Sequence, residues 1–472
     1  MEDICTYALE LGQKCSSYVE IKAERSLNNE FVIKNGNPET SGFDSSYGIS
    51  IRVLVDGALG FCSTNDLRRD KIRSMVEGAC SMARAASGLI KKPIVFSEEE
   101  SHHEVKYFVK ERTKSSDISP EEKMDVLNEI QRAIPQDVRL AGNLMHIEDG
   151  IKEKLYMNSE GSNIQSIIPT VNFFGFLTVV EDGDSAQAML EKGASKGWEA
   201  VTGWDLSNYV AEELTTLKTI LGKGKKAPDG SMDILCGPEV TGIASHESCG
   251  HPYEADRILG REAAQAGESF VSLDMLGTRI GSDLVTLVDD PTLEGSYGFY
   301  LYDDEGVKAR KRHLIKKGII NELLHNRETA GQLGLNSNGS ARCNSYDREP
   351  IVRMANTYVE PGEWKKDEII EETKRGILIN SFTEWNIDDR RYNQKYVSRE
   401  AYYIEDGEIK YPVKKVPLEI TTPKFWSSVD AVGDDLRFFA GNCGKGEPMQ
   451  GIPVYMGGPT MRLHDIELGG SI

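Results

Sequence analysis

One short segment of the sequence carries two histidines and a glutamate at a spacing that suits metal-dependent hydrolysis. His246 is followed directly by Glu247, and His251 completes the string His-Glu-Ser-Cys-Gly-His. In the related pattern His-Glu-x-x-His, two imidazoles on one helix face bind zinc and the glutamate serves as a general base. The segment therefore indicates a metal site with two histidine ligands and an adjacent base.

The two histidines stand one residue further apart than in that pattern. At about 100° per residue, positions i and i+5 lie roughly 140° apart on a regular helix, too far for both rings to reach one ion. Gly250 and Pro252 offer a remedy, because a π-helical turn or a helix end at Gly250 would swing His251 back towards His246. The alternative interpretation is one core histidine and one surface histidine, without a metal.

Two histidines leave this site one protein ligand short, because a catalytic zinc usually takes three and keeps one position for water. Cys249, Glu254 and Asp256 are the local candidates. Cys443 is a distant candidate, and three nearby glycines would let its backbone approach a helix closely. A buried cysteine without any metal role is the alternative for either thiol. Spacing alone does not choose among these residues.

The histidine segment requires a helix that follows a strand. Residues 232–236 form a short apolar run of the kind found in buried strands, and Pro238 suits the first position of a helix. Val240 and Ile243 would give that helix its inner face, with His246 about one turn further on.

Two charged groups in the second half invite other interpretations. One is a set of acidic residues, which could hold a second, oxygen-ligated metal but which we expect to lie in turns and at solvated strand ends. Its members are Asp289, Asp290, Asp303, Asp304 and Glu305. The other is the basic stretch 308–317, which alternates like an exposed strand.

The first half mixes helices and strands. Ser119 and Glu122 predict a capping box, with Pro120 at the first helical position and Pro135 ending the helix. Asp56-Gly57 predicts a hairpin turn. We further expect helices over 1–11, 67–87 and 209–221, strands over 18–25, 48–55, 58–63, 141–147, 155–158 and 164–180, and a connecting stretch over 91–114.

The best domain boundary is the run 222–230, which combines glycine, proline and charge. We therefore predict an amino-terminal α/β domain over residues 1–225 and a strand-rich domain with the metal-site helix over residues 226–472. This order of elements indicates an α+β chain, not regular βαβ alternation.

Composition excludes several classes of protein. The 472 residues include 55 Lys and Arg against 75 Asp and Glu, a net charge of −20, which argues against nucleic-acid binding. No apolar run approaches the length of a membrane span, and the amino terminus lacks the features of a signal peptide. We therefore expect a cytoplasmic protein whose eight cysteines are reduced and mostly buried.

Further motifs follow the histidine segment in a fixed order as far as the carboxyl end. They are Leu287-Val-Asp-Asp290, Tyr302-Asp-Asp-Glu-Gly306, Arg353-Met-Ala-Asn-Thr-Tyr358 and Cys443-Gly-Lys with Pro459-Thr. Together with His246–His251, Glu254 and Asp256, this series resembles the TldD/PmbA family of metallopeptidases over about half of the chain.

The resemblance carries expectations about the site. The family has a metal-bearing TldD type and a PmbA type without the metal motif, and this chain resembles the TldD type. By position, His246, His251 and Cys443 would bind Zn²⁺, and Glu247 would activate a zinc-bound water for hydrolysis of short or unfolded peptides. We expect such peptides to bind extended, as an added strand. The resemblance also implies a homodimer, or a heterodimer with a PmbA-like chain.

Two segments depart from the family pattern and bear on substrate preference and partner choice. Pro252-Tyr253 follows the second histidine, and Trp385-Asn-Ile-Asp388 stands where a glycine-rich strand start is usual. The alternatives to a peptidase are a non-catalytic, partner-binding regulatory module and a zinc amidohydrolase acting on a small substrate.

Overall fold

The computed structural model describes residues 1–262 and 267–468 of the chain. Helices and long strands make up its first half. In order they are α1 (Glu2–Gly12), β1 (Tyr18–Lys34), β2 (Asn37–Val55), β3 (Ala58–Thr64), α2 (Arg69–Ser87), β4 (Val105–Phe108), α3 (Pro120–Ala133), β5 (Leu140–Asn158), β6 (Asn163–Glu181), β7 (Asp184–Ala194), α4 (Glu199–Gly203) and α5 (Leu206–Lys223).

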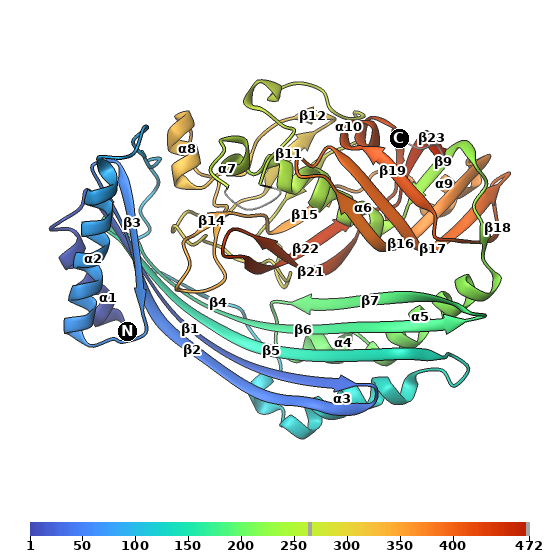
Figure 1. Ribbon diagram of the computed structural model, residues 1–472, viewed down its shortest axis with the longest axis horizontal. Helices are drawn as coiled ribbons and strands as arrows, with labels where there is room; N and C mark the ends of the chain where they lie inside the picture. The colour runs from blue at the N-terminus through green and yellow to red at the C-terminus, as the bar shows by residue number, and fades with distance from the viewer. Residues whose placement is uncertain (263–266, 469–472) are drawn as a thin grey trace.

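The strands of the first half form one sheet in the order β3-β2-β1-β5-β6-β4, and β7 pairs with β6. Figure 1 shows the long strands curving beneath the second half of the chain. Alternation along the strands gives the sheet two different faces. On β6, Val171 and Phe173 join a core cluster with residues of α3 and α5, whereas Asn172 and Phe174 line a cavity against the second half.

The structure confirms the predicted capping box and the predicted hairpin turn of the first half. The Ser119 hydroxyl accepts a hydrogen bond from the Glu122 backbone N–H, and the Glu122 carboxylate accepts one from the Ser119 N–H, which completes the capping box. Asp56 and Gly57 join β2 to β3 with φ angles of 49° and 78°, a left-handed pair that glycine adopts without strain.

Strand lengths depart from the prediction. The runs 141–147 and 155–158 belong to one continuous strand, β5, because its polar middle is satisfied by pairing. The Asp149 carboxylate in that middle lies 2.7 Å from the ammonium of Lys123 on α3, and both side chains are buried. The connecting stretch 91–114 contains β4, which pairs in parallel with β6.

The second half is richer in strands. Its elements are β8 (Lys225–Lys226), β9 (Gly230–Cys236), α6 (Pro238–Ser245), α7 (Ala255–Ile258), β10 (Leu287–Asp289), β11 (Arg312–Lys316), β12 (Ile319–Ile320), α8 (Arg327–Leu333), β13 (Ala341–Arg342), β14 (Ile351–Val352), β15 (Asn356–Val359), α9 (Lys366–Glu371), β16 (Arg375–Ile387), β17 (Asn393–Glu405), β18 (Glu408–Lys414), β19 (Pro417–Thr421), α10 (Thr422–Ser427), β20 (Val429–Val432), β21 (Arg437–Lys445), β22 (Gln450–Gly458) and β23 (Met461–Leu468).

Two sheets of the second half enclose α6. One has the order β20-β23-β9-β16-β17-β18-β8, with β19 paired to β17, and the other has the order β12-β11-β10-β15-β22-β21. Helix α6 contacts β16 of the first and β15, β21 and β22 of the second. Val240 and Ile243 on α6 are buried in the core cluster that both sheets share, as their spacing predicts. The helix that carries the histidine segment is therefore held from two sides.

The mixed helix and sheet content agrees with the predicted α+β class, while the division at residues 225 and 226 stays a prediction. Among residues 1–262 and 267–468, every helix is too short or too polar to cross a membrane.

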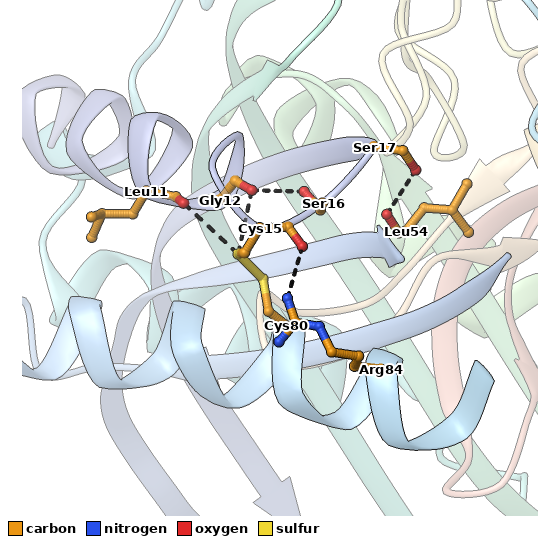
Figure 2. The surroundings of a disulfide bond; sticks show 8 residues. All are labelled: Leu11, Gly12, Cys15, Ser16, Ser17, Leu54, Cys80 and Arg84. Atoms are coloured by element: carbon orange, nitrogen blue, oxygen red, sulfur yellow. Dashed lines mark hydrogen bonds between the residues drawn. A yellow bond between two sulfur atoms is a disulfide. The ribbon is translucent and has the colours of Figure 1, made fainter. Parts of the chain in front are cut away.

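Two cysteines depart from the reduced state expected for all eight. Cys15, just after α1, forms a disulfide with Cys80 of α2, as Figure 2 shows. The two helices pack against each other, which brings together thiols 65 residues apart in the sequence. The other six cysteines are free, and five of these are buried.

The acidic set of the second half lies at the end of β10 and around the turn at Asp304-Glu305, as expected, but its side chains are buried and not solvated. Asp289 pairs with the guanidinium of Arg312, Asp304 with Lys154 at 2.8 Å and Glu305 with Arg52 at 2.6 Å. Arg312 is itself fully buried, so the stretch 308–317 is not a uniformly exposed strand. Cations from both halves of the chain thus neutralise Asp289, Asp304 and Glu305, whereas Asp290 and Asp303 accept hydrogen bonds from backbone N–H groups. These contacts give the acidic set a structural role.

We expect Arg312→Met to lower the free energy of unfolding by about 3–5 kcal/mol, because it leaves the Asp289 carboxylate buried without its cation. Arg310→Met is the matched control, since Arg310 is exposed and pairs with Glu322 at the surface, and it should change stability by less than about 1 kcal/mol. Urea unfolding followed by circular dichroism measures both. Equal effects of the two substitutions would contradict a structural role for the buried pair.

Candidate metal centre

The histidine segment is a helix that loosens at the histidines. Helix α6 continues as a π-helical turn over His246–Gly250 and a 3₁₀ turn over His251–Tyr253. Of the two alternatives that the sequence left open, the structure has the π-helical turn and not a helix end at Gly250. A Cβ atom on Gly250 would lie 1.8 Å from the sulfur of Met354, which is fully buried, so the turn requires glycine at this position. In an i→i+5 turn, residues five apart come onto one face.

The two imidazole rings meet edge to face, with centroids 4.9 Å apart. Cys443 on β21 joins them, and the three potential ligand atoms all lie within 4.8 Å of one another. The Cys443 sulfur is 3.4 Å from Nε2 of His251. A tetrahedral zinc with N and S ligands separates those ligands by about 3.5 Å, given bond lengths of about 2.0–2.3 Å.

The surroundings of the three side chains fit a metal ion. All three residues are buried, and Nδ1 of His246 has no hydrogen-bond partner among the residues that the structure describes. An unpaired buried polar atom is costly, and a bound cation would give the ring a partner. Two imidazoles and one thiol form a donor set that suits zinc.

Protonation states at this site also favour metal binding. Burial raises the pKa of the Cys443 thiol, but the charges of His251 and Arg353 and a hydrogen bond to His251 bring it down to about 7. Burial lowers the pKa of His246 by more than the nearby carboxylates raise it, so the ring is neutral at pH 7. Thiolate and neutral imidazole are the forms that ligate metals.

Glu254 orients His251. Its carboxylate lies 3.0 Å from Nδ1 of His251, 2.7 Å from Nε of Arg257 and 3.2 Å from the ammonium of Lys445. Burial alone would raise the pKa of Glu254, but Lys445, His251 and Arg257 hold it well below its usual range. An ionised carboxylate only accepts hydrogen bonds, so Nδ1 of His251 donates to Glu254, and Nε2 is the ring nitrogen that faces Cys443.

The other local candidates for a third ligand lie elsewhere. Cys249 is fully buried in the hydrophobic core, where burial holds the pKa of its thiol well above the usual value. Asp256 accepts hydrogen bonds from Lys445 at 2.7 and 2.8 Å. Glu254 is bound to the ring of His251 as described, so the group of three contains only Cys443 from the four candidates.

Glu247 is buried beside the cluster and pairs with the guanidinium of Arg391. Burial would raise the pKa of Glu247, but the positive charges of His251 and Arg391 outweigh it and hold the pKa below its usual value. The side chain is therefore a carboxylate at neutral pH, which is the form that accepts a proton.

Sequence reasoning missed Arg391, which lies 144 residues beyond Glu247 in the turn between β16 and β17. The Asp388 carboxylate shapes this turn by accepting hydrogen bonds from the backbone N–H groups of Tyr392 and Asn393 at 2.8 and 3.0 Å. The residues around Arg391 carry no signal for a contact with a side chain so far away in the sequence.

A cavity of about 520 Å³ opens onto the cluster. Both halves of the chain line it, because the inner face of the first sheet lies opposite β21 and β22. Its lining includes His246, Glu247, His251, Cys443 and Arg391.

A second cavity of about 360 Å³ adjoins the first. Three residues line both cavities, namely Glu148 and Asn172 from the first sheet and Asn442 from β21. The two cavities therefore meet beside Asn442 of β21, next to Cys443.

Models of one protein family match three parts of the chain. They describe PmbA/TldA metallopeptidase domain 1 over residues 19–83, the central domain over residues 113–221 and the C-terminal domain over residues 229–470. The chain belongs to the PmbA/TldD metallopeptidase family. This confirms the resemblance found in the sequence motifs.

Individual relatives agree with this assignment. A metalloprotease of Methanothermobacter thermautotrophicus is 33% identical over 459 residues, which cover 96% of each chain. A protein of Saccharolobus solfataricus named zinc metalloprotease TldD homolog is 25% identical, with 98% of each chain covered. The structure of TldE from Thermococcus kodakarensis has the same fold, with a TM-score of 0.77, 18% identity and coverage of 99% of this chain and 100% of that chain.

We expect Glu254→Gln to weaken Zn²⁺ binding by about 10–100-fold, because the neutral amide no longer holds His251 in its ligating orientation. Competition with a chromophoric chelator measures the affinity. Glu322→Gln is the control, since Glu322 pairs with Arg310 at the surface, and its affinity should equal that of the wild type. An unchanged affinity for Glu254→Gln would show that His251 is oriented without this carboxylate.

Cys443→Ser should greatly reduce Zn²⁺ binding, because a neutral hydroxyl replaces a charged, soft ligand. Cys249→Ser should keep its metal, although Cys249 lies inside the histidine segment, because this thiol packs in the core. Elemental analysis of both variants after loading with Zn²⁺ and gel filtration compares them directly. Loss of metal from Cys249→Ser with retention in Cys443→Ser would mean that the third ligand is local.

Proposed function

We propose that this member of the PmbA/TldD family is a zinc metallopeptidase that hydrolyses short or unfolded peptides. The observation that carries the proposal is the buried group His246, His251 and Cys443, which shares one cavity with the carboxylate of Glu247. A site for a metal ion, a base and space for a substrate are the three parts that metal-assisted hydrolysis requires.

The donor set supports zinc as the metal. Imidazole and thiolate ligands suit zinc, whereas Mg²⁺ and Ca²⁺ prefer oxygen ligands. The name of the relative from Saccharolobus solfataricus includes zinc, which agrees with this choice. Three protein ligands would leave one coordination position open, as in catalytic zinc sites.

Bound zinc would supply a Lewis acid that acidifies water and polarises the scissile carbonyl group. Glu247 takes the proton from the attacking water and passes it to the leaving amine. The Arg391 guanidinium keeps the Glu247 carboxylate ionised and turned towards the cavity. His251 is held by Glu254, so the ligand and the base on the same helical turn keep a fixed relation.

The edge of β21 supports binding of an extended peptide. This strand ends its sheet, and its consecutive residues 439–444 all line the cavity, with Cys443 among them. An edge strand offers unpaired backbone N–H and C=O groups, to which a peptide can add as a further strand. The adjoining second cavity, which Asn442 of β21 also lines, gives such a peptide further room.

We further propose that the protein acts in the cytoplasm as a homodimer or as a heterodimer with a PmbA-like chain. The family membership and the shared fold with TldE support a partner of this kind. A protein that binds zinc but cleaves no peptide would instead act as a partner-binding module, and cleavage of small amides alone would make it an amidohydrolase.

Glu247→Gln should reduce peptide hydrolysis by about 10²–10⁴-fold while zinc stays bound, because the residue acts as a base and not as a ligand. Digests of a peptide mixture by the zinc-loaded wild type and variant, analysed by mass spectrometry beside elemental analysis, measure both quantities. Glu363→Gln changes an exposed glutamate and serves as the control with full activity.

Two results would contradict this assignment. Loss of zinc from Glu247→Gln would make the residue a ligand, and full activity would exclude it as the base. Hydrolysis by the wild type that survives complete removal of zinc by a chelator would contradict the metallopeptidase itself.

A further inference from the structure

Part of the wall around the metal-site cavity is apolar. Its large side chains come from both halves of the chain, on β6, β7, β16, β21 and β22. They are Phe174, Met189, Phe382, Trp385, Phe439 and Met456. The same cavity contains His246, His251 and Cys443. A substrate group bound to this wall would therefore lie close to the bond that is cleaved.

Two side chains of the wall expose apolar surface. Trp385 is 38% exposed and Met189 is 41% exposed, although both lie in a concave site. Strand β7, which carries Met189, contacts both β16 and β21, so the two halves converge here. Exposed apolar side chains that converge in a cavity are typical of a site for an apolar group.

Trp385 is held in place before any ligand arrives. Its ring packs edge to face on Phe382, with centroids 5.6 Å apart, and Phe382 packs in turn against Tyr396 at 6.5 Å. Phe382 is only 9% exposed and Tyr396 only 1%, so the support belongs to the core. A rigid aromatic surface binds an apolar group at a low cost in side-chain entropy.

The position of Trp385 links the apolar wall to the predicted chemistry. Trp385 stands near the end of β16, and Arg391 follows in the turn that leads to β17. Arg391 pairs with Glu247, so one hairpin carries both the aromatic surface and the partner of the candidate base. A side chain bound on Trp385 therefore belongs to a substrate residue close to the scissile bond.

We propose that Trp385 and Met189 form the binding site for a bulky apolar or aromatic side chain of the peptide substrate, adjacent to the bond that is cleaved. This inference rests on the proposed function, because it assigns a substrate preference to the same cavity. Backbone pairing on β21 aligns any extended peptide, and the apolar wall determines which residue of the peptide binds next to the metal. Cleavage sites should therefore lie at one fixed offset from a Phe, Leu or similar residue.

Binding to the Glu247→Gln protein loaded with zinc tests this site separately from hydrolysis. The probes are ten-residue peptides of Ser, Gly and Gln with one Phe, or with Ala at the same place, measured by isothermal titration calorimetry. We expect the Phe peptide to bind about 10–100-fold more tightly. Adding Trp385→Ala should reduce this difference to less than threefold, and Trp385→Phe should retain most of it.

Trp364→Ala is the matched control, because Trp364 is also 38% exposed but lies outside the cavity lining, and it should keep the full difference. If Trp385→Ala fails to fold or to bind zinc, Met189→Ser carries the same expectation. Equal binding of the Phe and Ala peptides by the parent protein would overturn the proposal, as would a full difference in Trp385→Ala. If the Phe preference depends on Trp385 but the wild type hydrolyses no peptide, the apolar binding site is supported and the proposed peptidase activity is refuted.

Discussion

The π-helical turn at His246–Gly250 is the constraint on which the rest of the site depends. A regular helix would point the two imidazoles in different directions, and no movement of β21 would then bring one thiol to both rings. The turn is possible because Gly250 lets the backbone pass close to Met354. Once His251 faces His246, the helix presents Glu247 to the same cavity, so one irregular turn brings two candidate ligands and the candidate base together.

Such a turn has to be stabilised by its surroundings, because π-helical segments are rare and buried charges are costly. Buried ion pairs surround this turn. Glu254, Asp256 and Arg257, which follow the turn in the sequence, form a buried network with Lys445 of β21. Lys445 lies two residues beyond Cys443 on β21. The network therefore links β21, which carries Cys443, to the helical segment that carries His246 and His251, and it orients His251 through the Glu254 carboxylate.

The cavity follows from the packing of the two halves. The first sheet turns one face to α3 and α5 and the other to the cavity beside the histidine segment, as the alternation of Val171 and Phe173 with Asn172 and Phe174 on β6 shows. Its curvature brings that second face under β21 and β16 (Figure 1). Buried ion pairs across the two halves, such as Lys154 with Asp304 and Arg52 with Glu305, fix this arrangement. The cavity beside the candidate metal ligands is thus formed where the two halves pack against each other.

The sequence by itself determined the features that depend on neighbours along the chain. The capping box at Ser119, the turn at Asp56-Gly57, the start of α6 at Pro238 and the need for an irregular helix at His246–Gly250 all follow from residues within a few positions of one another. Tertiary structure decided which residues meet from afar, and only the family resemblance named Cys443 in advance. Cys443 reaches His251 across 192 residues, Arg391 reaches Glu247 across 144, and the carboxylates of Asp304 and Glu305 are buried against cations from the other half. Local propensity and spacing carry no information about such contacts, because they arise only when sheets and helices pack and the chain closes long loops.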